Sequence, residues 1–403
     1  MTASIASPGP PIVLRRALCA ARDGRWPDAP RVRIYALLVL VAWLPMLAKV
    51  FLEATGTTGS DFLAFWGAGK LVLAGHPALA YDLPAQQAAQ AASGTGQLVA
   101  YVNPPPYLLL VWPLGMLPFA GAWIAWNLVG WAVWFAVARR VSPAHALAIL
   151  SSPVAYLAAS HAQNGFLTAA LLIGGVLALG RRPALAGLLF GALVIKPHLA
   201  LLVPLWLACG RQWRAIAFAA LSALGLCALS LAAFGWQTWA AYPESFKVSQ
   251  SLMSQTSGPF YLRMCTPYAA LHVLAGPSFA LWLQAAITLA MLALTALAWR
   301  RTRDAQATGA VMLAATALGS PYLFAYDLAF LVQPVFWIAA QARAHGWRAW
   351  EKPALIALWL APLATRAAAL PLGLNLMPLA AAALLALVWT RLVDVRTEAA
   401  TAS

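Results

Sequence analysis

Long apolar stretches alternate with short polar ones along nearly the whole chain. The first, residues 34–52, follows an arginine-rich N-terminus and is longer than the apolar core of a secretory signal, so we interpret it as a retained membrane anchor. Several later stretches are too short, or too interrupted by proline, to cross a core of about 30 Å as straight helices, and we expect roughly ten to twelve membrane segments. These later stretches are residues 106–117, 120–138, 144–159, 166–179, 184–208, 215–234, 279–299, 305–318, 323–340, 354–370 and 374–392.

Charge parity leaves one pair of segments open. Residues 106–117 and 120–138 cannot both cross the membrane if Asn103 lies outside and Arg139 inside. Either one of them is re-entrant or one basic pair breaks the charge rule.

Two polar loops separate the apolar stretches and are expected on the outer face, at about residues 53–103 and 235–276. In the first, residues 62–74 have helical spacing, with an apolar side typical of a helix that lies in the membrane interface. Residues 84–92 form a second helix candidate. The second loop is rich in tryptophan and tyrosine, which also favours the interface.

The composition agrees with a lipid environment. Hydrophobic residues make up 63% of the 403 positions and charged residues only 9%, with a mean hydropathy of +0.76. We predict an all-α, polytopic membrane protein with a cytoplasmic basic tail (1–33), one membrane domain (34–392) and a C-terminal tail (393–403). The four cysteines are scattered and predict no disulfide framework.

The net charge of +15 reflects orientation in a membrane and not nucleic-acid binding. Twenty of the 26 Lys and Arg residues sit in short clusters beside apolar segments, which marks the cytoplasmic side. Few ionisable residues remain for chemistry elsewhere. They are Lys49, Lys70, Lys196, Lys247, Arg263 and Arg366 among the bases, and Glu53, Asp61, Asp82, Glu244 and Asp327 among the acids.

Asp61 follows the first span directly. Its spacing favours an N-cap of the helix at 62–74, since Asp is a preferred capping residue. A carboxylate at the membrane surface is equally suited to act as a general base for an acceptor hydroxyl.

Lys196 and His198 interrupt the apolar run 184–208, with Pro197 between them. Lys196 lies about a dozen residues, or roughly 18 Å of helix, from either end, which makes snorkelling difficult. We therefore expect a polar cavity here, where a lysine, a histidine and a helix break suit an anionic headgroup.

Three further polar interruptions stand out. Residues 160–165 contain Gln163 and Asn164 and are either a turn or a binding site for sugar hydroxyls. Residues 320–327 contain Tyr322 and Asp327, and a carboxylate within an apolar run indicates function. Residues 101–107, with three consecutive prolines after Asn103, are interpreted as a stiff entry to a helix.

The motifs of nucleotide-driven pumps, zinc proteases and serine hydrolases are absent from the sequence. We expect neither a metal nor a cofactor. A secondary transporter or lipid flippase is the alternative function, with Lys196 and Asp327 in a substrate or proton pathway, although the chain shows no related halves.

Six short motifs occur in order: Asp61-Phe62-x-x-Phe65-Trp66, Gly75-His76-Pro77 with Tyr81-Asp82, Asn103-Pro104-Pro105-Pro106, Gln163-Asn164, Ala186-Gly187 with Ile195-Lys196-Pro197, and Pro321-Tyr322 with Tyr326-Asp327. Their series, from about residue 34 to beyond 327, resembles glycosyltransferase family 87. The family commonly shows Gly-Gln where this chain has Ala162-Gln163.

The resemblance implies a helical bundle of the GT-C type that takes a sugar from a polyprenyl-phosphate donor at the non-cytoplasmic face. It reverses the preference at Asp61, which occupies the position of the expected catalytic base. We assign donor-phosphate binding to Lys196, His198 and Arg263. Sugar or acceptor binding is expected of Asp82, Asn103, Gln163, Asn164, Tyr322 and Asp327.

The expected reaction is an inverting transfer to a lipid or glycan acceptor, with a mannose-like hexose preferred over a pentose. The expected location is a bacterial-type inner membrane, with a cytoplasmic N-terminus and a periplasmic active site. The partners are then the polyprenyl-phosphate sugar, the acceptor and membrane lipid, and not nucleic acid.

Overall fold

The computed structural model describes residues 12–56, 58–255 and 257–401, so residues 1–11 of the predicted tail lie outside it. The described residues fold into helices and turns, with one isolated bridge between Met264 and Phe324. The predicted all-α fold is confirmed.

Five helices in the described part have the length and hydropathy needed to cross a membrane, and six shorter apolar stretches of 10–17 residues accompany them. The chain is therefore a multi-pass membrane protein, as the sequence predicts. The long helices are α2 (Ala29–Thr55), α6 (Phe119–Ala138), α12 (Trp213–Ala241), α16 (Pro277–Arg301) and α19 (Glu351–Leu372).

The other helices are shorter or continue past the apolar stretch. They are α1 (Ile12–Arg22), α3 (Leu63–Leu73), η1 (Pro77–Tyr81), α4 (Leu83–Ala91), η2 (Pro105–Tyr107), α5 (Leu108–Val111), η3 (Trp112–Met116), η4 (Pro143–His145), α7 (Ala146–Leu150), α8 (Pro153–His161), α9 (Gly165–Leu179), α10 (Pro183–Gly191), η5 (Ala192–Ile195), η6 (Pro197–Ala200), α11 (Val203–Cys209), α13 (Glu244–Gln255), α14 (Ser257–Arg263), α15 (Pro267–Ala275), α17 (Ala305–Gly319), η7 (Ala325–Leu331), α18 (Val332–His345) and α20 (Met377–Thr401).

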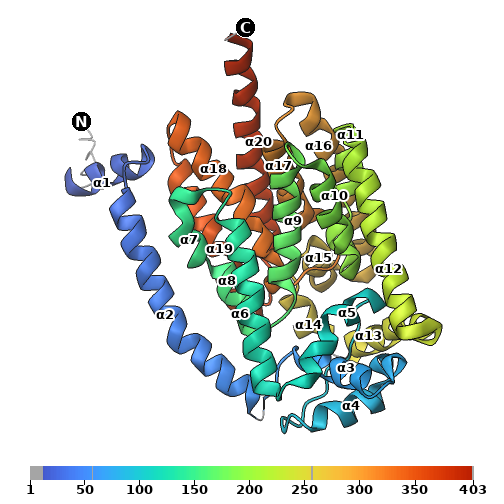
Figure 1. Ribbon diagram of the computed structural model, residues 1–403. Helices are drawn as coiled ribbons and strands as arrows, with labels where there is room; N and C mark the ends of the chain where they lie inside the picture. Colours follow the sequence, from blue (N-terminus) through green and yellow to red (C-terminus); the bar gives the residue numbers. More distant parts are fainter. Residues whose placement is uncertain (1–11, 57, 256, 402–403) are drawn as a thin grey trace, which may run out of the picture.

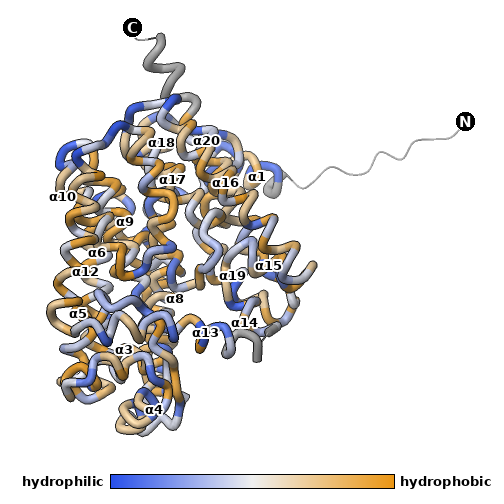
Figure 2. The backbone as a smooth tube through the Cα atoms, turned by 90° about the vertical axis from the view of Figure 1, so that its right-hand side faces the viewer, coloured by the Kyte–Doolittle hydropathy of each residue, from blue (hydrophilic) through white to orange (hydrophobic). Residues whose placement is uncertain are grey.

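The two ends of the helical bundle differ in charge. Figure 1 shows α3, α4 and α13 at one end, which we call the loop end, and α1 with the C-terminal part of α20 at the other. At this second end the backbone N–H of Trp350 donates to the carbonyl of Arg22, and the guanidinium of Arg348 donates to the carbonyl of Thr390. These contacts bring together the arginine-containing segments around Arg22, Arg348 and Thr390, so we call this second end the basic end. Hydrophobic residues occupy most of the length between the ends (Figure 2).

The segment 106–117 does not form a membrane-length helix. Prolines at its start (104–106) and at position 113 divide it into η2, α5 and η3, of which α5 and η3 pack beside α3 at the loop end. A Cβ atom on Gly69 of α3 would lie 2.6 Å from the carbonyl oxygen of Val111, so only glycine allows this approach. The long α6 then runs toward the basic end, in agreement with the re-entrant interpretation of 106–117.

Helix α3 covers the predicted 62–74 but is less one-sided than its sequence suggests. Residues 63–69 are all buried, whereas Leu73, expected on the apolar side, is 45% exposed. Small residues at Ala64, Gly67, Ala68 and Gly69 let η1, α4 and η3 pack on the remaining faces. The expected second helix is α4.

The apolar run 184–208 is broken in its middle. Lys196 adopts φ −152° and ψ 71°, a non-helical conformation, and the proline that follows it disfavours the helical one. The run therefore becomes α10 with η5 on one side and η6 with α11 on the other. Lys196 is thus presented from a helix break, as its position before Pro197 predicts.

Candidate active site

A cavity of about 280 Å³ lies among the loops at the loop end. Three charged side chains line it, from three separate parts of the chain: Asp61 before α3, Arg263 at the end of α14, and Arg366 on α19. The other lining residues are Val99, Ala100, Val102, His161, Gln163, Phe260, Tyr322, Phe324, Ala325 and Tyr326.

Asp61 does not cap α3 through its side chain. The helix begins at Leu63 without a side-chain capping bond, and the hydroxyl of Ser60 accepts from the N–H of Phe62 instead. The cap favoured by spacing is therefore wrong. The Asp61 carboxylate is half-buried and faces the cavity, with no hydrogen bond or ion pair to another described residue.

Tyr322 is electrostatically coupled to this carboxylate. Burial raises the pKa of the Tyr322 phenol above its ordinary value, and the charges of Asp327 and Asp61 raise it further. The phenol therefore stays protonated near neutral pH and can donate a hydrogen bond into the cavity. His198, from η6, packs against the Tyr322 ring at right angles, with ring centroids 5.5 Å apart.

The segment after α14 is tied to the loop that carries Tyr322. The backbone N–H of Cys265 donates to the carbonyl of Leu323 at 2.7 Å, and the side chain of Asn375 donates to the carbonyl of Met264. These bonds position Arg263 beside residues 322–326. Arg366 lines the cavity, although the sequence pattern places it only among the non-cytoplasmic bases and predicts no role for it. A charged residue within the apolar run 354–370 is the feature of the sequence that could have indicated a functional role for Arg366.

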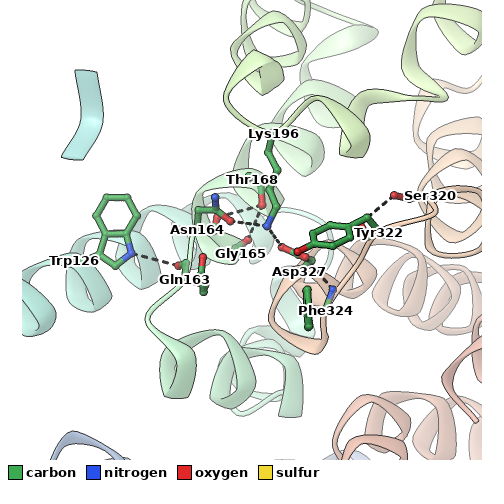
Figure 3. Close-up of polar contacts among 10 residues, drawn as sticks. All are labelled: Trp126, Gln163, Asn164, Gly165, Thr168, Lys196, Ser320, Tyr322, Phe324 and Asp327. Carbon is green, nitrogen blue, oxygen red and sulfur yellow. Dashed lines mark hydrogen bonds and ion pairs between the residues drawn. The ribbon is translucent and has the colours of Figure 1, made fainter. Parts of the chain in front are cut away.

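Lys196 and Asp327 form a buried ion pair close to the cavity (Figure 3). The Lys196 ammonium lies 2.5 Å from an Asp327 carboxylate oxygen and 2.8 Å from the Asn164 amide oxygen. The second Asp327 oxygen accepts from the N–H of Phe324 at 3.1 Å. Neither charged residue of the pair lines the cavity. The predicted ligands differ for the two residues, the donor phosphate for Lys196 and the sugar or acceptor for Asp327, whereas their side chains contact each other.

A close backbone contact between the start of α9 and η7 supports this network. A Cβ atom on Gly165 would lie 1.9 Å from the carbonyl oxygen of Tyr326, so the start of α9 can approach η7 only through glycine. Asn164 precedes that glycine, and the indole of Trp126 donates to the carbonyl of Gln163 at 3.3 Å. The turn at 160–165 therefore has a structural role, while Gln163 also faces the cavity.

Ala162 departs from the backbone conformation that its side chain prefers. It ends α8 in the left-handed region, with φ 47° and ψ 36°. Glycine is the usual residue in that conformation, which explains why a Gly-Gln pair suits this turn.

Like Lys196 and Asp327, the predicted binding residues Asp82, Asn103, Asn164 and His198 lie outside the cavity lining. The carboxylate of Asp82 caps α4 by accepting from the N–H of Ala85 at 2.9 Å. The carbonyl of Asn103 accepts from the hydroxyl of Tyr81 at 2.9 Å, which ties the proline-rich segment to η1. Both contacts stabilise the loops around the cavity.

A second, apolar cavity of about 300 Å³ shares Gln163 with the first. It lies among α5, η3, α6 and α9. Its lining is completed by Leu110, Leu114, Ala125, Trp126, Val129, Gly130, Val133, Phe166 and Leu167. A polar, charged chamber and an apolar one thus meet at a single side chain.

No three His, Cys, Asp or Glu side chains among the described residues lie close enough together to hold a metal ion. The charged groups that line the polar cavity are one carboxylate and two guanidinium groups.

Fold and cavity define a multi-pass helical membrane protein with a charged chamber at the ends of its helices. The family model of glycosyltransferase family 87 matches residues 101–324, more than half of the chain, and the chain belongs to that family. It is therefore a membrane glycosyltransferase. The match includes Gln163, Lys196 and Arg263 but not Asp61 or Asp327. Neither the curated proteins nor the solved structures include a match to the chain.

Proposed function

We propose that the protein transfers a sugar from a polyprenyl-phosphate donor to a lipid or glycan acceptor, with inversion, in the cavity at the loop end. The observation that carries the proposal is the charge content of this cavity, one carboxylate with two guanidinium groups. Those are the groups that a transfer from a lipid phosphate requires, a proton acceptor and an anion clamp.

Asp61 acts as the general base in this mechanism. Its carboxylate removes the proton from the acceptor hydroxyl, whose oxygen attacks the anomeric carbon. The bond between that carbon and the phosphate oxygen breaks, and its electron pair leaves with polyprenyl phosphate. The freedom of the Asp61 carboxylate from partners among the described residues supports this role.

Arg263 and Arg366 stabilise the phosphate that leaves. Guanidinium groups bind phosphate through paired, charge-assisted hydrogen bonds, which strengthen as negative charge develops. Lys196, first assigned to the phosphate, acts as a positioning residue, because its ammonium is bonded to Asp327 and Asn164. His198 supports Tyr322 from behind, and Tyr322 and Gln163 contact the sugar.

The apolar cavity beside Gln163 accommodates the start of the polyprenyl chain. Its lining by α5, α6 and α9 is apolar and lies next to the charged chamber, so the chain and the phosphate of one donor fit the two chambers. A mannose-like hexose is the preferred sugar and an arabinofuranose the alternative.

The positive-inside rule orients the molecule. With the basic end in the cytoplasm of a bacterial-type inner membrane, the N-terminus is cytoplasmic and the cavity opens on the periplasmic side. The acceptor and the sugar then meet where water and the donor lipid are both present.

The test compares purified wild type, Asp61→Asn and Asp82→Asn with a panel of polyprenyl-phosphate sugars. We expect Asp61→Asn to lower kcat by about 10²- to 10⁴-fold, as for loss of a general base. Asp82→Asn, on the same loop, should retain wild-type activity because Asn caps a helix as well as Asp. A folded Asp61→Asn protein with the wild-type rate would refute the role of Asp61. Absence of transfer from every such donor would refute the donor class.

A further inference from the structure

Helix α2 lies at the edge of the bundle (Figure 1) and buries little of its own surface. Ala36, Trp43 and Ala54 are its only buried residues. Trp43 anchors its middle by stacking on Tyr156, with ring centroids 4.6 Å apart, and by donating to the carbonyl of Ser151. Closer to the basic end, α2 does not close onto its neighbours.

An apolar cavity of about 150 Å³ fills that space, between α2 and the helices α18 and α19. It is lined mainly by aliphatic and aromatic side chains, such as Val39, Phe336, Leu355 and Trp359. A second cavity of about 170 Å³ lies next to it and shares His145, Trp347 and Lys352 with the first. The two form one amphipathic groove.

Basic side chains line the second cavity: Arg33 on α2, Arg343 on α18 and Lys352 on α19. The Lys352 ammonium is held in place by the carbonyls of Gly24 at 3.0 Å and Pro27 at 2.5 Å. Among the described residues, no acidic side chain lines either cavity. The nearby acids are engaged elsewhere, Asp28 with Arg31 and Glu351 with Arg391.

The charges of these basic side chains also act on His145, the last residue of η4. Burial lowers the pKa of this histidine, and the charges of Arg343 and Lys352 lower it further. The mouth of the groove therefore carries a net positive charge, which the charge of Asp28 near Lys352 offsets only in part.

We propose that this groove binds an anionic phospholipid, with an acyl chain along α2 and the headgroup phosphate against Arg33, Arg343 and Lys352. Charge complementarity selects a lipid anion, since basic pockets between membrane helices recognise such headgroups. The apolar part lies between two helices of membrane-spanning length, so a lipid chain can enter it sideways. The lipid would complete the packing of α2, independently of the transfer reaction at the other end.

The test measures lipid retention by native mass spectrometry on the full chain from nanodiscs of phosphatidylcholine with added phosphatidylglycerol. The variant Arg33→Gln/Arg343→Gln removes two charges that make no hydrogen bond or ion pair with other described residues. The matched control, Arg301→Gln/Arg303→Gln, removes two exposed charges at the same end but outside the groove. A third variant, Val39→Phe, fills the apolar part and keeps every charge.

Wild type should retain phosphatidylglycerol in preference to phosphatidylcholine. We expect weaker retention in the double variant, about fivefold for each charge removed, and unchanged retention in the control. Val39→Phe should also reduce retention. Equal losses in the double variant and its control would overturn the proposal in favour of general surface attraction. Full retention by Val39→Phe would overturn the placement of the chain, and equal retention of both lipids would overturn the anionic headgroup.

Discussion

Two buried ion pairs, one near each end of the bundle, have almost the same burial but different surroundings. In the Lys196–Asp327 pair the side chains are 8% and 0% exposed, and in the Arg391–Glu351 pair 7% and 3%. Arg391 donates through Nε and Nη2 to both oxygens of Glu351 and also to the carbonyl of Gly346. This second pair joins α20 to the start of α19.

The Lys196–Asp327 pair joins the break between η5 and η6 to the short helix η7. Its partners, Asn164 and the N–H of Phe324, belong to segments that also line the cavity. We therefore expect the Arg391–Glu351 pair to join helices and the Lys196–Asp327 pair to support the candidate site. Disrupting the two pairs should separate stability from activity.

The largest effect is expected from Asp327→Asn. This change leaves the Lys196 ammonium buried without its counter-charge, which costs about 3–5 kcal/mol when a buried pair loses one member. Thermal unfolding in detergent should show a large loss of stability, and transfer activity should fall with it. Wild-type stability in Asp327→Asn would contradict the close contact between the two side chains.

A smaller effect distinguishes the two pairs when both members are replaced by apolar residues. Such replacements are often neutral for stability, so Glu351→Leu/Arg391→Met and Lys196→Met/Asp327→Leu should each unfold within about 1–2 kcal/mol of wild type. We expect the first double variant to keep its transfer activity and the second to lose it. If both variants retain activity at equal stability, the Lys196–Asp327 pair does not position the site.

The sequence predicts the importance of Lys196 and Asp327 but not their contact. Each charge within an apolar stretch is costly and thus conspicuous, whereas their separation of 131 positions in the sequence hides their proximity. For the Arg391–Glu351 pair, the sequence predicts neither the importance of the two residues nor their contact. Both residues stand in basic clusters typical of cytoplasmic ends, so nothing in the local pattern indicates that they are buried together.

Backbone conformation was predictable where it depends on residues adjacent in sequence. The break at Lys196 follows from Pro197, and the end of the straight part of α12 follows from Gly235, whose φ is 75°. Spacing alone favours a cap at Asp61, but Phe62 stands at the N-cap position of α3 without a side-chain bond, and the hydroxyl of Ser60 accepts from the N–H of Phe62. The position of Arg366 in the cavity could not be predicted, because α19 and α14 are far apart in sequence and meet only in the folded chain.

The smallest effect on stability is expected at Ala162, in the turn that positions Asn164 to accept from Lys196. Its left-handed conformation costs an alanine roughly 1–2 kcal/mol, which glycine does not incur. Loss of the buried methyl group opposes that gain by about 0.8 kcal/mol. Ala162→Gly should therefore raise the free energy of unfolding by roughly 0.2–1.2 kcal/mol.

Ala158 provides the matched control, because it is equally buried but lies inside α8. There, glycine loses the methyl group and about 1 kcal/mol of helix propensity without any relief, so Ala158→Gly should cost about 2 kcal/mol. The difference between the two variants isolates the backbone conformation from the loss of burial. If both lose the same stability, Ala162 is not strained, and the Gly-Gln pair of the family has another cause at this turn.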